Sequence, residues 1–178
     1  MKFLTWQNPG RSALLLGLSK NFLLLRCLKS LIYNSVAELR MTIKDKLQNL
    51  VSRYQKAKDS GQLQGASEAT MRTWIDELLS LFGWNVQNTH QVLTEHTLGK
   101  AEKEKLQEIG STNTRPDYTL VNGTVKLSFV DAKSLAVNIA EDKDAAFQIR
   151  SYGWSISAPF SIVTNFEQLA IYDCSAMP

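Results

Sequence analysis

The stretch from residue 115 to residue 133 constrains the fold of this chain more than any other. Two segments rich in strand-forming residues, 117–121 and 125–133, lie on either side of Asn122 and Gly123. An Asn-Gly pair between two such segments is the strongest short signal for an antiparallel hairpin. The sequence therefore predicts a hairpin here, around which the remaining elements must be arranged.

The segments around this hairpin predict helices and further strands. Apolar residues recur at three- and four-residue spacing after Thr42 and again after Ser67, which predicts two helices. Ser67 is a good N-cap for the second helix, and Gly83 stands where a helix-terminating glycine belongs. Further expected elements are a strand within 85–98, a charged helical stretch over 100–108, a helix over 138–152, and strands over 160–164 and 169–173. We therefore expect an α/β fold, a mixed β-sheet flanked by helices.

The second strand of the hairpin combines apolar residues with an acid and a lysine. Side chains alternate between the two faces of a strand, so alternate residues share a face. One face carries Val125, Leu127, Phe129, Asp131 and Lys133. We expect the three apolar residues to be buried at one end of this face and the charged pair to emerge at the other. Asp131 then offers hard oxygen to Mg²⁺ beside a lysine, although a plain ion pair is the alternative interpretation.

Asp117 supplies a second carboxylate, and its position depends on the register of the hairpin. A strict two-residue Asn-Gly loop would place Asp117 opposite Ser128, pointing away from Asp131. A loop one residue longer would place Asp117 opposite Phe129, with both acids on one face. A functional role for this pair therefore predicts a three-residue loop, a bulge, or a strongly bent first strand.

The spacing of these residues resembles a known nuclease motif. Pro116-Asp117, followed by Asp131-x-Lys133, resembles the motif of the PD-(D/E)xK nuclease superfamily. Gln148-x-x-x-Tyr152 is similar to an element of the branch that contains type I and combined restriction-modification nucleases. The segment 67–84, a helix with an acid that ends in Gly-Trp, is similar to the first helix of that branch. The resemblance spans about 42–173 and implies a restriction-endonuclease-like core with the order αβββαβ.

Two acids compete for the role that this first helix implies. Met71, Ile75 and Leu78 belong to its apolar stripe, and Glu68 lies at the edge of that stripe. Glu77 lies roughly half a turn away and is expected to face solvent. Glu68 is therefore the better candidate, with a favourable first-turn interaction with the helix dipole as the alternative explanation.

The resemblance implies Mg²⁺-dependent hydrolysis of phosphodiester bonds in double-stranded DNA. Asp117, Asp131 and the backbone carbonyl of Ala132 would bind Mg²⁺, and Glu68 would bind a second ion or an outer water. Lys133 would orient or deprotonate the attacking water and add positive charge.

The resemblance also assigns supporting residues and partners. Gln148 would position a water or a phosphate oxygen, and Tyr152 would brace the pocket or contact the DNA backbone. Relatives of the combined type continue into an adenine methyltransferase, so methyltransferase and specificity domains or subunits are the expected partners. Because no base-reading module is evident, we expect the isolated chain to bind DNA weakly and with little sequence preference. The alternative is a non-catalytic DNA-binding or assembly module with a nuclease-like fold.

Charge is distributed unevenly along the 178 residues. Residues 1–40 hold six Lys or Arg and one acid, which leaves fourteen basic and sixteen acidic residues in 41–178. Bulk charge therefore gives no support to nucleic-acid binding, which must depend on a site. We expect a nuclease domain over 41–178 and a basic extension over 1–40, upstream of a translation start at Met41. The apolar runs of that extension are interrupted by charges, so we expect no membrane span and a cytoplasmic location.

Overall fold

The computed structural model describes residues 43–178. A first helix occupies residues 43–59. The other elements, in chain order, are α2 (Glu68–Leu81), β1 (Val92–Thr94), α3 (Lys100–Glu108), β2 (Tyr118–Asn122), β3 (Val125–Ala132), α4 (Lys143–Ser155), β4 (Phe160–Thr164) and β5 (Leu169–Asp173). The expected extension over 1–40 lies outside the described residues.

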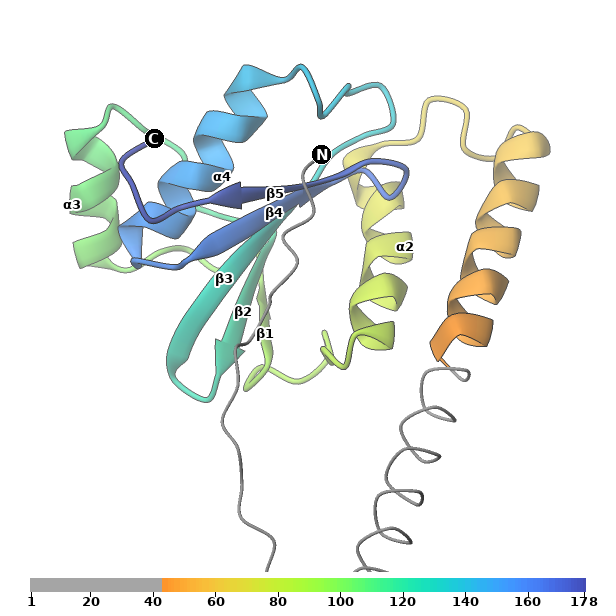
Figure 1. Ribbon diagram of the computed structural model, residues 1–178, viewed down its shortest axis with the longest axis horizontal. Coiled ribbons are helices and arrows are strands. Elements are labelled where there is room, and N and C mark those ends of the chain that lie inside the picture. Colours follow the sequence, from red (N-terminus) through yellow and green to blue (C-terminus); the bar gives the residue numbers. More distant parts are fainter. Residues whose placement is uncertain (1–42) are drawn as a thin grey trace, which may run out of the picture. The chain divides into compact units, whose positions relative to one another are not determined.

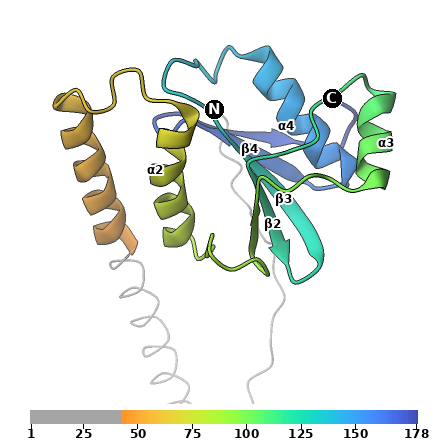
Figure 2. The same ribbon diagram turned by 180° about the vertical axis from the view of Figure 1, so that it is seen from behind.

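The five strands form one mixed sheet in the order β1-β2-β3-β4-β5. Neighbouring strands are antiparallel except β3 and β4, which are parallel and are connected through α4. The sheet lies between α2 on one side and α3 with α4 on the other (Figures 1 and 2). This arrangement confirms the predicted α/β fold of a mixed sheet flanked by helices, and it is consistent with a restriction-endonuclease-like core.

Two hydrophobic cores fix the helices to the two faces of the sheet. On one face, Met71 and Ile75 of α2 pack against a cluster that includes Val130 of β3. On the other face, Ile149 of α4 packs in a cluster that includes Phe129. Successive residues of β3 thus enter different cores, which holds the end of this strand, next to Asp131, between α2 and α4.

The ends of α2 agree with the sequence prediction. The Ser67 side chain accepts a hydrogen bond from the backbone N–H of Thr70, so Ser67 is the N-cap, and Phe82 is the C-cap. Gly83 follows with a φ of 89°, in the left-handed region that favours glycine. The start of α2, where Glu68 lies, is therefore fixed by local sequence.

Two expectations about the hairpin over 117–133 were wrong in detail. Val125 and Leu127 are exposed (59% and 39%), so only Phe129 buries the apolar end of its face. The hairpin turns at Gly123 and Thr124, because Asn122 pairs with Val125 in the ladder.

The helix expected over 138–152 begins later, at Lys143. Residues 138–142 form a turn in which the N–H groups of Glu141 and Asp142 donate to the carbonyl of Asn138 (3.1 Å each). Asp142 then caps α4 by accepting from the N–H of Ala145 at 2.9 Å. The capping residue, rather than the apolar pattern, decides where this helix starts.

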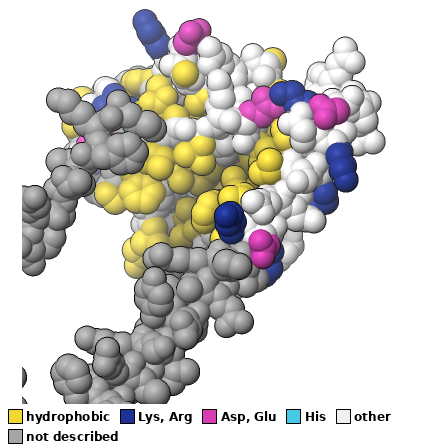
Figure 3. Space-filling model, turned by 45° about the vertical axis from the view of Figure 1, so that its right-hand side comes forward, with side chains coloured by type: hydrophobic (Ala, Val, Ile, Leu, Met, Phe, Trp, Pro, Cys, Tyr) yellow, Lys and Arg dark blue, Asp and Glu magenta, His cyan; other side chains and the backbone are white. Residues whose placement is uncertain are grey.

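Some apolar side chains remain on the surface of the described region. Phe160, Leu169 and Ile171 of β4 and β5 are exposed. Figure 3 shows apolar side chains gathered on one side of the molecule. Within residues 43–178, no helix is both long and apolar enough to cross a membrane.

Candidate active site

A bulge in the hairpin sets the relative positions of the two aspartates. The register shifts between Leu120 and Val121, so that Val121 pairs with Lys126 while Leu120 pairs with Ser128, and Leu127 is the extra residue. The bulge that the functional interpretation requires is thus present, but the expected pairing of Asp117 with Phe129 was wrong, because Phe129 pairs with Thr119. Beyond it, the ladder continues to the pair Tyr118–Val130.

The shifted register carries Asp117 to the position opposite Asp131. Asp117 directly precedes β2, and Tyr118 is already paired with Val130. A carboxylate oxygen of Asp117, Oδ2, accepts a 2.7 Å hydrogen bond from the backbone N–H of Ala132. The first acid is thereby anchored to the strand that carries the second.

One polar cleft contains most of the residues that the sequence analysis proposes. Its lining residues are Glu68, Arg72, Glu95, Asn113, Arg115, Asp117, Asp131, Lys133 and Gln148. They come from α2, from the loops before β2, from β3 and from α4. Five candidates far apart in sequence are therefore brought together, while Tyr152 lies behind the cleft.

Asp131 and Lys133 form a tight ion pair at the end of β3. Lys133 Nζ lies 2.5 Å from Asp131 Oδ2, and the two side chains are only 17% and 4% exposed. Burial raises the pKa of Asp131, although the attraction of Lys133 opposes this change. Burial would lower the pKa of Lys133, but Asp131 outweighs that effect and raises it. Lys133 is therefore protonated in the free chain.

Asp117 is a buried acid whose ionised form is destabilised by its surroundings. Burial and the repulsion of Asp131 raise the pKa of Asp117 to about 6. Hydrogen bonding from the Ala132 N–H and the charge of Arg72 act in the opposite direction and do not fully compensate. A neighbouring positive charge would therefore stabilise the ionised form of this pair of acids.

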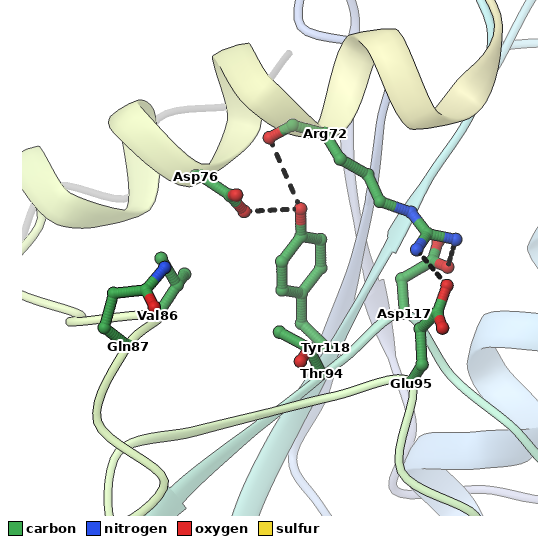
Figure 4. A pocket seen from close by; sticks show the side chains of 8 residues that line it. All are labelled: Arg72, Asp76, Val86, Gln87, Thr94, Glu95, Asp117 and Tyr118. Atoms are coloured by element: carbon green, nitrogen blue, oxygen red, sulfur yellow. Dashed lines mark hydrogen bonds and ion pairs between the residues drawn. The ribbon is translucent and has the colours of Figure 1, made fainter.

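Arg72 and Glu95 are members of the site that sequence reasoning missed. Arg72 lies on α2 and directs its guanidinium to Asp117 and Glu95, as Figure 4 shows. Glu95 also accepts from Arg115 Nη2 at 2.8 Å. The i,i+4 spacing of Glu68 and Arg72 is the one sequence signal that could have indicated the arginine, since such pairs face each other on a helix.

A chain of polar contacts connects Lys133 to α4. Lys133 Nζ donates to Gln148 Oε1 at 3.4 Å, and Gln148 Nε2 donates to the Tyr152 hydroxyl at 3.2 Å. Tyr152 is fully buried, with its ring centroid 5.6 Å from that of Phe129, and burial raises its pKa to about 12. Gln148 thus lies at the cleft, whereas Tyr152 reaches it through Gln148.

The two glutamates of α2 have different surroundings. Glu68 lines the cleft and contacts Arg72 Nη2 at 3.1 Å. Glu77 instead forms an ion pair with Arg53 of the first helix, where both side chains are nearly half exposed. The placement of Glu68 agrees with its choice over Glu77, and its role stays a prediction.

The oxygen donors of the cleft suit a hard divalent cation. Asp117, Asp131 and Glu68 offer carboxylate oxygens, the ligands that Mg²⁺ prefers. In the region 43–178, however, no three His, Cys, Asp or Glu side chains are placed so that they could hold a metal ion as they stand. Arg72 lies between Asp117 and Glu68. The predicted Mg²⁺ ligands, including the carbonyl of Ala132, therefore stay a prediction.

Comparison with known proteins supplies one relative. The chain is 32% identical over 136 residues to the type II restriction enzyme and methyltransferase RM.Eco57I of Escherichia coli. The match covers 76% of this chain and spans about 14% of the length of that relative. No family model matches the chain, and no solved structure matches it.

This similarity supports a domain of a restriction-modification enzyme. The chain is a partial homologue of an enzyme whose name combines restriction and methyltransferase activities. The mixed sheet flanked by helices is consistent with the fold that the nuclease resemblance implies. The similarity suggests a role related to restriction-modification.

Proposed function

We propose that this chain is a Mg²⁺-dependent endonuclease domain that hydrolyses phosphodiester bonds of double-stranded DNA within a restriction-modification system. The observation that carries the proposal is the convergence of Asp117, Asp131 and Lys133 in one cleft. Each residue comes from the motif Pro-Asp…Asp-x-Lys, and the bulge at Leu127 is what aligns the first acid with the others. The relative's name supports restriction as the biological context.

The carboxylates of the cleft would hold Mg²⁺. Asp117, Asp131 and Glu68, with the carbonyl of Ala132, are the residues that would bind the ion. When bound, Mg²⁺ supplies Lewis acidity at the scissile phosphate and activates water. The raised pKa of both aspartates favours this role, because a cation stabilises the carboxylate forms that burial disfavours.

Lys133 and Gln148 would act on water and on the phosphate. Lys133 is protonated in the free chain, so it donates a hydrogen bond and adds positive charge where the transition state gains negative charge. Gln148 keeps Lys133 oriented through its Oε1 and has a cleft-facing amide with which to position a water. Tyr152 holds that amide from behind, so it is a positioning residue.

The partners follow from the same proposal. Contacts of Arg115 and Lys133 with phosphate would give affinity for DNA without sequence preference. Sequence recognition and methylation would then belong to other domains or subunits, as in an enzyme that combines restriction and methyltransferase activities.

Nicking of a supercoiled plasmid by the full chain tests the proposal. We expect conversion to nicked and linear DNA with Mg²⁺ and none with excess EDTA. If the chain binds DNA but leaves it intact with Mg²⁺ and with Mn²⁺, the alternative of a non-catalytic DNA-binding or assembly module is the correct one.

A further inference from the structure

Arg72 connects three carboxylates that come from three parts of the chain. Its Nη2 lies 3.1 Å from Glu68 Oε1 on its own helix and 2.5 Å from Asp117 Oδ1. Its Nη1 pairs with Glu95, which directly follows β1. One guanidinium nitrogen thus lies between two of the acids that the proposed function assigns to Mg²⁺.

We propose that Arg72 is an internal counterion that holds the place of the divalent cation and leaves it when the cation binds. This inference rests on the proposed function. The second oxygen of Asp117 is already engaged by the Ala132 N–H, so Oδ1 is the oxygen left for a metal ion. A cation that used Asp117 Oδ1 together with Glu68 would need the position of Arg72 Nη2.

The contacts of Arg72 allow such an exchange. Its Nε is buried without a hydrogen-bond partner in the described structure, so the guanidinium is incompletely satisfied where it lies. Nη1 has a separate partner in Glu95, which keeps the side chain at the cleft after Nη2 is displaced. Arginine suits phosphate by its planar fork of donors, so the displaced group would face the DNA backbone.

Glu95 is built to retain the arginine. It has a φ of 48°, a left-handed conformation that is strained for a glutamate. Two backbone contacts hold it there: its N–H donates to the Asp117 carbonyl at 2.8 Å, and its own carbonyl accepts from Arg115 Nε at 2.7 Å. In this position Glu95 directs its carboxylate at Arg72, and Glu95 is not one of the acids proposed to bind Mg²⁺.

Calorimetric titration of the full chain with Mg²⁺, without DNA, tests the exchange. We expect Arg72→Gln to lower the Kd for Mg²⁺ about tenfold or more, which corresponds to about 1.4 kcal/mol. Arg115→Gln is the matched control: it removes one positive charge from the same cleft, but Arg115 is 60% exposed and pairs with Glu95 alone. It should change the Kd by less than about threefold, since exposed charges are screened.

Each outcome decides between the possibilities. An equal gain in Mg²⁺ affinity in the two variants would mean that removing any positive charge from the cleft has this effect. A weaker Mg²⁺ affinity in Arg72→Gln would mean that the arginine holds the site in shape. Either result overturns the inference while leaving the metal site intact. If wild type and both variants bind no Mg²⁺, the proposed function fails together with the inference.

Thermal unfolding provides a readout that does not depend on affinity alone. Without metal, Arg72→Gln should melt below wild type, because its carboxylates have lost their counterion. Saturating Mg²⁺ should then raise the Tm of Arg72→Gln more than that of wild type. If the variant is unfolded in EDTA, Mg²⁺ should fold it. A loss of stability that Mg²⁺ does not restore would overturn the exchange.

Discussion

Asp117 accepts a 2.7 Å hydrogen bond from the backbone N–H of Ala132, so the first acid of the cleft is fixed to the strand that carries the second. The two acids therefore face each other only because β3 contains one residue more than β2 over the paired stretch, at Leu127. A buried pair of like charges results. Such pairs cost stability and are typical of sites whose charge is used in binding or catalysis.

The cost of this arrangement predicts how stability depends on pH without metal. The pKa of Asp117 is raised from 3.8 to about 6, so the folded chain holds a proton that the unfolded chain has released. The contribution of protonated Asp117 to the free energy of unfolding is complete below about pH 4 and is lost as pH rises through about 6. Asp117→Asn keeps the neutral form at every pH. In EDTA at pH 8 it should therefore exceed wild type in free energy of unfolding by up to about 3 kcal/mol.

Urea unfolding of both proteins at pH 4 and pH 8 measures this difference directly. The gain of Asp117→Asn should be small at pH 4, because Asp117 is then still protonated in the folded wild type and only partly ionised in the unfolded chain. A variant less stable than wild type at pH 8 would mean that the contacts of the ionised acid with Arg72 and Ala132 outweigh its burial.

The two glutamates of α2 predict different effects on cleavage. Glu68→Ala removes a carboxylate from the cleft and should slow plasmid nicking about tenfold or more, the scale of a supporting ligand. Glu77→Ala removes an acid of the same helix that pairs with Arg53 on the surface, and it should leave the nicking rate unchanged. Equal rates in the two variants would exclude Glu68 from the site.

The placement of Tyr152 predicts an indirect effect. Tyr152→Phe deletes only the hydroxyl that accepts from Gln148 Nε2, so Gln148 loses its anchor and nicking should fall roughly tenfold, about 1.4 kcal/mol. Tyr54→Phe is the control, since it deletes a hydroxyl bonded to Glu167 away from the cleft. If the rate falls equally in both variants, the loss reflects stability instead of positioning. The comparison uses plasmid-nicking rates of the wild type and both variants, measured at saturating Mg²⁺.

Helix α4 lies in close contact with the sheet region at Gly153. A Cβ built on Gly153 would overlap Cys174 and lie 2.7 Å from Ser161 Oγ. Gly153→Ala should therefore lower the free energy of unfolding by about 1–3 kcal/mol. Gly99→Ala is the matched control, because its Cβ would meet only the flexible end of Glu102 and should cost under about 1 kcal/mol. Urea unfolding of the two variants makes the comparison. Equal losses in free energy of unfolding would show that α4 can shift to make room for the added methyl group.

Local sequence predicted the elements well wherever a local signal decided the structure. The bounds of β4 and β5 agree with the prediction, and Ser67 caps α2 as expected. The Asn122-Gly123 pair predicted the hairpin, although the turn itself lies one residue later. These features depend on propensity, capping and turn chemistry, which the sequence contains directly.

The arrangement of the cleft depends on contacts that no local pattern contains. The hairpin sequence allowed a longer loop, a bulge or a bent strand, and it did not choose the bulge at Leu127. Arg72 could be seen only as a partner of Glu68, because Asp117 and Glu95 reach it from other parts of the chain. The acids and the lysine were predictable from their motif, but their counterion was not.

Plasmid nicking by two substituted chains tests the central claim most directly. Asp131→Asn and Lys133→Met each remove one member of the buried pair, and each should slow Mg²⁺-dependent nicking by roughly 10²-fold or more. Lys126→Met and Asp173→Asn are the matched controls, since Lys126 pairs with Glu102 elsewhere and Asp173 is on β5. The account predicts wild-type rates for these controls. Unchanged metal-dependent nicking in Asp131→Asn and Lys133→Met would contradict it and leave the cleft without a hydrolytic role.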